Sequence, residues 1–128
     1  MAIKIFMHER LIKNRTQEQI NQLKADFIQY KRDGIQPSNF GRDEPYDRPA
    51  SVKLAELRHI HLNYDTGWPL RIARWQRTSN IALVYCEGWH SKENFLLITL
   101  LDKAHEQARK TTFMAELAEV AERFRSKY

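Results

Sequence analysis

The chain has 128 residues, enough for one compact domain over 1–128 with its own apolar core and too few for two. Its 21 Lys and Arg outnumber its 16 Asp and Glu, and the resulting net charge of +5 favours a polyanionic partner such as RNA, DNA or the ribosome. An acidic protein partner would satisfy the same charge. The amino-terminal apolar run is too short for a secretory signal and no stretch is long enough to span a bilayer, so we expect a cytoplasmic protein with no membrane partner.

The first predicted elements are a strand and a helix. Residues 2–7 alternate apolar and charged side chains, which predicts a short strand. Thr16 and Gln19 have the spacing of a capping box, which predicts the start of a helix that ends at Gly34. One apolar stripe runs along this predicted helix and consists of Ile20, Leu23, Phe27 and Tyr30.

The middle of the chain is predicted to contain a loop, a short helix and a strand. Glycines and prolines interrupt residues 34–51, which predicts a loose loop. A short helix is predicted at residues 52–56, and a strand follows at residues 57–63. Because side chains alternate between the two faces of a strand, His59 and His61 are predicted to share one face.

Two nearly continuous apolar runs, residues 81–87 and 94–101, predict a hairpin of central strands. The single cysteine, Cys86, lies in the first run and is expected to be a reduced, buried thiol without a chemical role. An apolar stripe from Thr112 onward predicts a final helix. The order strand, helix or helices, three strands, helix indicates an α+β fold.

The segment from Asp26 to Pro49 places cations beside aromatic and turn residues. This combination suits phosphate contact and base stacking on unpaired RNA. An ordinary surface loop of a basic protein would look similar, so both interpretations stay open. The candidate contacts with RNA or the ribosome in this segment are Lys31, Arg32 and Arg42.

The strongest candidates for chemistry are His59 and His61. Alternate residues of a strand point the same way and lie about 6.5 to 7 Å apart, which suits two groups that address one phosphodiester. Histidine exchanges protons near neutral pH. RNA supplies its own nucleophile, the 2′-hydroxyl, so this chemistry needs no metal and no cofactor.

Three other interpretations of the histidine pair stay open. A His-x-His pair can bind zinc, but a zinc site needs at least a third ligand, and neither Cys86 nor the other histidines show clustered spacing, so we expect no metal. The two histidines could also lie on an exposed sheet face without a function. They could instead line an interface with a protein partner.

Several sequence blocks follow one another in a distinctive order: DFIQYKRDG and then FGRD, HIHL at 59–62, RTSN at 77–80 and LVYCEG at 83–88. In this order they resemble the YafO family of toxins from bacterial type II toxin–antitoxin pairs. The resemblance runs from about residue 23 to residue 124. It implies a RelE-like fold, with a small, mostly antiparallel sheet packed against amino-terminal helices and a carboxy-terminal helix. It also implies ribosome-dependent mRNA cleavage and a cognate, YafN-like antitoxin.

The same resemblance indicates where a site would lie. In RelE, a strand of the form KIKL carries two lysines at the alternating positions that His59 and His61 occupy here, which favours a catalytic role for the histidines. The arginine that precedes LVY in RelE is Ala82 here. Another cation must then stabilise the phosphate, and we expect Arg77 or Arg74. Both belong to an insertion, residues 64–80, whose arginines could equally form a solvated helical face; Arg71 is the third of them and a candidate RNA contact.

RelE-like toxins also keep functional groups after the last strand of the sheet. Here that segment carries Lys103, His105 and Arg109. His105 is the candidate for the second proton-transfer group, and the other two are candidate RNA contacts. The alternative is that this segment is only a polar connector or a short helix.

These features predict a toxin that acts as a metal-independent, ribosome-dependent endoribonuclease and so inhibits translation. Its partners would be an antitoxin, the ribosome and mRNA. One alternative is a non-enzymatic toxin of the same fold that binds DNA gyrase, as in the ParE branch. A second is a degenerate copy that only binds an antitoxin.

Overall fold

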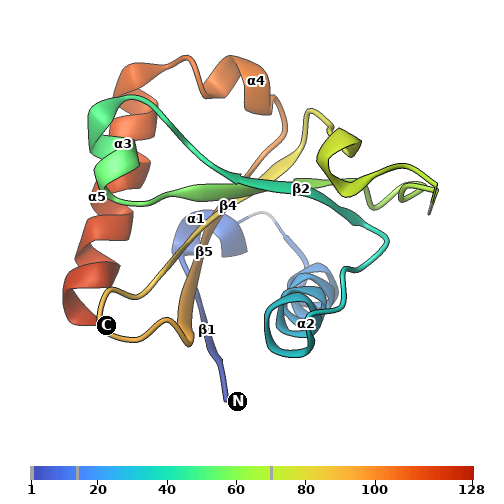
Figure 1. The fold of residues 1–128 in the computed structure, drawn as a ribbon. Helices are drawn as coiled ribbons and strands as arrows, with labels where there is room; N and C mark the ends of the chain where they lie inside the picture. Colours follow the sequence, from blue (N-terminus) through green and yellow to red (C-terminus); the bar gives the residue numbers. More distant parts are fainter. Residues whose placement is uncertain (1, 14, 70) are drawn as a thin grey trace.

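The computed structural model describes residues 2–13, 15–69 and 71–128 and contains one five-stranded sheet (Figure 1). The strands lie in the order β1-β5-β4-β3-β2. β1 runs parallel to β5, and the other neighbouring pairs are antiparallel. The strands are β1 (Lys4–Met7), β2 (Phe40–Pro45), β3 (Arg58–Leu62), β4 (Ala82–Glu87) and β5 (Asn94–Leu101).

Helices cover both faces of this sheet. α2 and α1 pack on one face, around a core that includes Phe27, Leu83 and Leu97, whereas α5, α3 and α4 pack on the other face, around Val84, Ile98 and Leu117 (Figure 1). The expected α+β class is therefore confirmed. The helices are α1 (Glu9–Ile12), α2 (Gln17–Asp33), α3 (Ala50–Leu54), α4 (Ala104–Gln107) and α5 (Thr111–Lys127), with a 3₁₀ turn, η1, at Arg74–Gln76.

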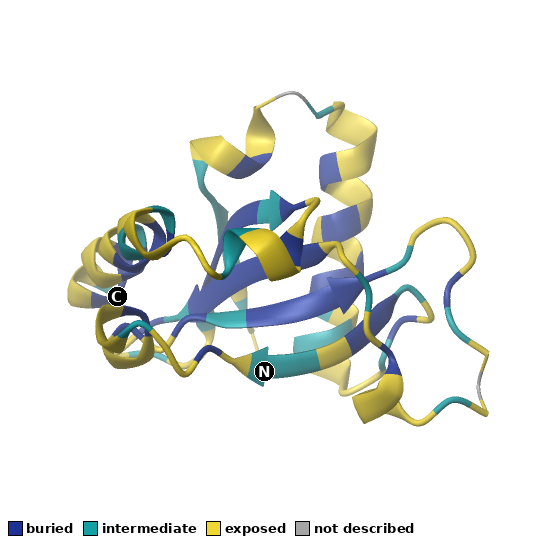
Figure 2. Ribbon diagram, turned by 90° about the horizontal axis from the view of Figure 1, so that it is seen from above, coloured by how far each residue is buried: buried dark blue, intermediate teal, exposed yellow. Residues whose placement is uncertain are grey.

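Local sequence signals explain the two long helices. The Thr16 side chain accepts a hydrogen bond from the Gln19 N–H while the Gln19 side chain accepts one from the Thr16 N–H, which confirms the predicted capping box. α2 ends at Gly34, whose φ of 69° is a left-handed cap. α5 starts at Thr111, one residue before the predicted start, and its buried stripe faces the sheet (Figure 2). In the described part of the chain, no helix has the length and apolar character needed to cross a membrane.

The predicted loop over residues 34–51 was wrong for Phe40–Pro45, which form β2. Glycine and proline in this segment are typical of loops, yet β2 is an edge strand, and an edge strand tolerates both. The pairing of β2 with β3 is irregular between Phe40 and Asp43, after which Glu44 lies opposite His59. β2, which the sequence did not predict, therefore adds Glu44 to the residues around His59.

Candidate active site

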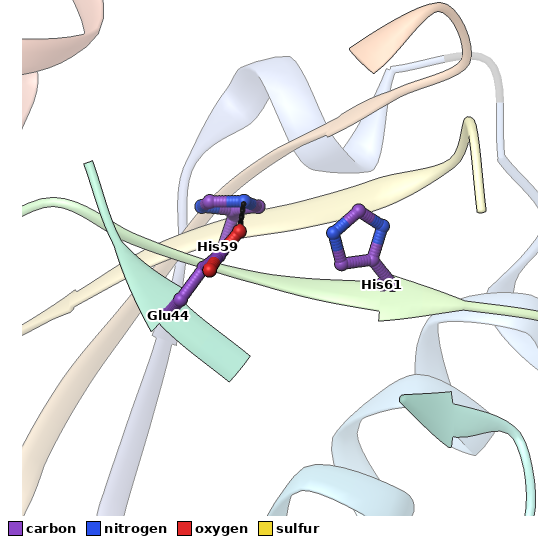
Figure 3. Close-up of side chains that lie close together, drawn as sticks. All are labelled: Glu44, His59 and His61. Carbon is purple, nitrogen blue, oxygen red and sulfur yellow. Dashed lines mark ion pairs between the residues drawn. The ribbon is translucent and has the colours of Figure 1, made fainter. Parts of the chain in front are cut away.

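β3 holds His59 and His61 on the sheet face that packs against α5. In the register of the sheet, His59 pairs with Val84 and His61 pairs with Ala82, and Val84 and Ala82 both belong to the core beneath α5. The two imidazole ring centres are 5.4 Å apart. Figure 3 shows the two rings rising from the same strand, as the alternation of side chains predicts.

β2 brings a carboxylate to this pair. Glu44 lies directly opposite His59, and its Oε1 is 3.2 Å from His59 Nε2 (Figure 3). The other carboxylate oxygen, Oε2, is 2.6 Å from the guanidinium of Arg42, two residues earlier on the same strand. Tyr46, two residues after Glu44, stacks on the His59 ring, with ring centres 4.1 Å apart. His59 is thus held by a stacked ring and by a carboxylate.

Backbone groups hold His61. Its Nδ1 lies 3.0 Å from the Ser79 N–H nitrogen and 2.8 Å from the Ser79 carbonyl oxygen. The Ser79 N–H can donate to Nδ1 in one tautomer and the Ser79 carbonyl can accept from it in the other, so the backbone accommodates both. In either case Nε2 is left free of this contact.

α4 adds a third histidine. The His105 ring centre is 6.0 Å from that of His61, and the His105 N–H donates to the side-chain oxygen of Asn80. His61 therefore lies between two other imidazoles. Unlike His59 and His61, which are buried, His105 is exposed.

Burial sets the protonation of the two strand histidines. Burial, and to a smaller extent the nearby His61, lower the pKa of His59 to about 4 against an opposing effect of Glu44. Burial also lowers the pKa of His61. Both imidazoles are consequently neutral near pH 7, the form that accepts a proton.

A groove of about 710 Å³ opens beside this cluster. His59 and Glu44 line it from the sheet, and His105 and Arg109 line it from the segment around α4. Arg48 also lines the groove and is exposed, so cations border it on two sides. The carboxylates of Glu44 and Asp47 line the same groove, so its formal charge is balanced, but two arginines and two imidazoles in one groove suit contact with a phosphodiester.

Several predicted RNA contacts lie elsewhere. Lys31 belongs to the opposite face of the sheet, where it approaches the buried Asp43 carboxylate at 3.7 Å and lies over the Tyr85 ring, so its predicted RNA contact is not supported. Arg74 lies over the ring of Tyr30 on that same side. The exposed cations of the predicted set are Arg32, which pairs with Asp33, and Arg42, Arg71, Arg74, Lys103 and Arg109.

The expected role of Arg77 in stabilising phosphate needs correction. Its side chain is buried, Nε donates to the Ile72 carbonyl at 2.9 Å, and Nη2 donates to the Pro69 carbonyl at 3.3 Å. Its own carbonyl accepts from the N–H of Arg42. Arg77 therefore fastens the 64–80 insertion to β2, and Arg109 and Arg48 are the arginines that line the groove.

Glu44 is the site residue that sequence reasoning missed. Once residues 40–45 are recognised as a strand, alternation puts Arg42 and Glu44 on one face, and an antiparallel neighbour puts that face beside the histidines. The alternation is present in FGRDEPY, but the glycine and proline of this segment favour a loop. Tyr46, an aromatic residue of the same segment, is buried and stacks on His59.

Comparisons with known proteins agree on the class of protein, a toxin of a type II toxin–antitoxin system. A family model described as "Toxin YafO, type II toxin-antitoxin system" matches residues 28–126, so the chain belongs to the YafO toxin family. The "mRNA interferase toxin YafO" of Escherichia coli (strain K12) is 39% identical over 119 residues, which cover 88% of this chain and 90% of that protein. No solved structure matches.

Proposed function

We propose that this chain cleaves translated mRNA on the ribosome, without a metal, and that its antitoxin partner suppresses this activity. One observation carries the proposal: donor atoms of Glu44, His59 and His61 lie within 4.8 Å of one another beside a groove bordered by arginines. The similarity to a protein named mRNA interferase toxin supports the same substrate. Action on translated mRNA would place the protein in the cytoplasm.

The first step of the proposed reaction is removal of the 2′-hydroxyl proton. Glu44 Oε1 and His59 Nε2 are 3.2 Å apart and share one groove wall, so they act as one couple that takes this proton. The neutral state of His59, which follows from its lowered pKa, leaves the couple able to accept it. The 2′-oxygen then forms a bond to the adjacent phosphorus.

The second step is departure of the 5′-oxygen. The bond between phosphorus and this oxygen breaks, and His105, on the facing wall of the groove, donates the proton that the oxygen takes up. Arg109 and Arg48 offset the charge that develops on the phosphorane oxygens, and His61 orients the cluster from beneath. The products are a 2′,3′-cyclic phosphate and a 5′-hydroxyl.

The ribosome supplies the alignment that this small site lacks. Holding a phosphodiester and its catalytic groups in a reactive geometry lowers the barrier by up to about 7 to 11 kcal/mol. A groove with few base-specific contacts then suffices, because the ribosome presents the message. The expected consequence is cleavage only of messages under translation.

Primer extension on mRNA from cells that express the chain, with and without a translation inhibitor, tests the proposal. We expect cuts in translated messages only, and a loss of about 100-fold or more in His59→Ala and in His105→Ala, since proton transfer contributes at least this much. His90→Ala is the matched control, because His90 is exposed and lies outside the groove. Circular dichroism checks that each variant is folded.

Three outcomes would contradict the proposal. Cuts that persist when translation is blocked would exclude dependence on the ribosome. Full cleavage by folded His59→Ala and His105→Ala would remove the histidines from the mechanism. Intact mRNA together with DNA damage signals would favour a gyrase-binding toxin instead.

A further inference from the structure

The cluster that faces the groove has the composition of a transition-metal site. Glu44, His59 and His61 each offer one ligand atom, and these atoms all lie within 4.8 Å of one another. Two histidines and one glutamate are a ligand set that zinc uses in sites with an open fourth position. The sequence argument against a metal rested on the lack of a third ligand, and β2 supplies that ligand.

The spacing is close to what zinc needs. Bonds of about 2.0 to 2.1 Å in a tetrahedral arrangement place ligand atoms about 3.3 Å apart. The Glu44 Oε1 to His59 Nε2 distance is already 3.2 Å. The ligand atoms of Glu44, His59 and His61 are at most 4.8 Å apart. The two most distant ligand atoms must therefore approach each other by about 1.5 Å at most to reach the tetrahedral separation, which a rotation of the His61 or Glu44 side chain provides.

Neighbouring groups already hold two of the three ligands, His61 and Glu44, as outer partners of a metal site do. Ser79 contacts His61 Nδ1 and leaves Nε2 free of this contact, and Arg42 binds Glu44 Oε2, so that Oε1 faces His59 Nε2. His59 Nδ1 is buried and has no hydrogen-bond partner among the described residues. The exposed His105, whose ring centre is 6.0 Å from that of His61, is near enough to supply a fourth ligand.

We propose that Glu44, His59 and His61 bind a zinc-class divalent ion, with His105 or water in the fourth position, and that the bound ion inhibits the toxin. Imidazole ligands select zinc and its neighbours over magnesium and calcium, which prefer oxygen. Inhibition follows because the ion occupies the carboxylate oxygen and the imidazole nitrogen that would take the 2′-hydroxyl proton. The inhibition rests on the proposed function, whereas the binding does not.

Binding is tested first, on purified protein freed of metal by a chelator. The protein is titrated with cobalt, which absorbs visible light intensely when it is bound in a tetrahedral site. Zinc is then added to displace the cobalt, and the loss of the absorption shows that both ions use the same site. We expect one ion per chain and a loss of affinity of at least 10-fold in His61→Ala and in Glu44→Gln. His90→Ala, with an exposed histidine outside the cluster, should bind as the unmodified protein does. Magnesium should not displace cobalt.

The functional consequence is tested in a reconstituted translation reaction that keeps its magnesium. Zinc should suppress mRNA cleavage by the unmodified toxin, and a chelator selective for zinc should restore it. If the metal-free protein does not bind cobalt or zinc, or if His61→Ala and Glu44→Gln bind as tightly as the unmodified protein, the site is refuted while the nuclease proposal stands. Cleavage that rises with zinc and falls after chelation would refute inhibition. A chelated, folded toxin that cleaves nothing refutes the proposed function and leaves the binding result intact.

Discussion

Asp43 is the last residue of the FGRD block, and its side chain stabilises the fold. Its buried carboxylate accepts hydrogen bonds from the hydroxyls of Tyr30, at 2.6 Å, and Tyr85, at 2.8 Å, and from Arg58 Nε at 3.2 Å. Lys31 approaches the same carboxylate. Some of the basic and aromatic residues that suggested RNA contact, such as Tyr30 and Lys31, therefore hold α2 against the sheet. They do so on the face opposite the histidines.

Replacing this carboxylate tests the structural role. In Asp43→Asn, two cations lose the negative charge that they share, and an NH2 donor replaces one of the two oxygens that accept from the tyrosine hydroxyls. We expect the free energy of unfolding to fall by about 3 kcal/mol, as for other broken buried ion pairs. Urea unfolding followed by circular dichroism measures the change. Asp65→Asn is the control, because Asp65 is exposed and such substitutions change stability by about 0.5 kcal/mol or less. Equal stability of the two variants would refute the structural role of Asp43.

At the scale of single residues, chemical type was easier to predict than position. His59, His61 and His105 stand out because imidazole is suited to proton transfer, and the structure places the His61 ring within 6.0 Å of both other rings, measured between ring centres. Arg77 and Lys31 were predicted to contact RNA, whereas the structure places both away from the groove. These predictions differ from the structure because charge in a sequence does not tell whether a side chain meets solvent or a buried partner. Only the packed structure assigns those partners.

At the scale of elements, β2 is the strand on which the site depends. The helices and the β4–β5 hairpin follow from periodicity and caps, which are local signals. β2 has a weak local signal and is held by its pairing with β3 and by the 64–80 insertion, which are contacts between distant segments. For that reason the sequence did not predict β2, and the place of Glu44 beside the histidines could not be predicted either.

Gly41 tests the contact between β2 and the insertion. A Cβ at this position would lie 2.2 Å from the Arg77 carbonyl oxygen and 2.9 Å from the Trp68 ring. We expect Gly41→Ala to lower the free energy of unfolding by about 2 kcal/mol, as overpacking does. By displacing β2, it should also reduce mRNA cleavage. Thermal unfolding and primer extension measure the two effects.

Gly34 provides the comparison for this prediction. It caps α2 with a φ of 69° and has open space around it. Because Asn tolerates this backbone conformation, Gly34→Asn should change stability by less than about 1 kcal/mol and leave cleavage intact. If Gly41→Ala is as stable and as active as Gly34→Asn, β2 does not depend on the close approach at Gly41.

At the scale of the whole molecule, the two faces of the sheet have different tasks. Figure 1 shows α2 on one face of the sheet and α5 on the other. The α2 face carries an apolar core and the Asp43 network, whereas the α5 face carries both a core and, towards β2, the histidine cluster and its groove. The class of fold could be predicted because the order of elements is a property of the whole sequence. The groove could not, because it forms where β2, β3 and the segment around α4 meet.

The central claim is that this cluster moves protons so that RNA attacks its own backbone. The chemical ends of the cleaved message test it most directly, measured on mRNA cut by the toxin in a translation reaction with a zinc-selective chelator. We predict a 2′,3′-cyclic phosphate on one fragment and a 5′-hydroxyl on the other, and no cut at a codon whose 2′-hydroxyl at the scissile position is replaced by hydrogen. A 5′-phosphate with a 3′-hydroxyl, or cleavage of the deoxy-substituted codon, would contradict the account.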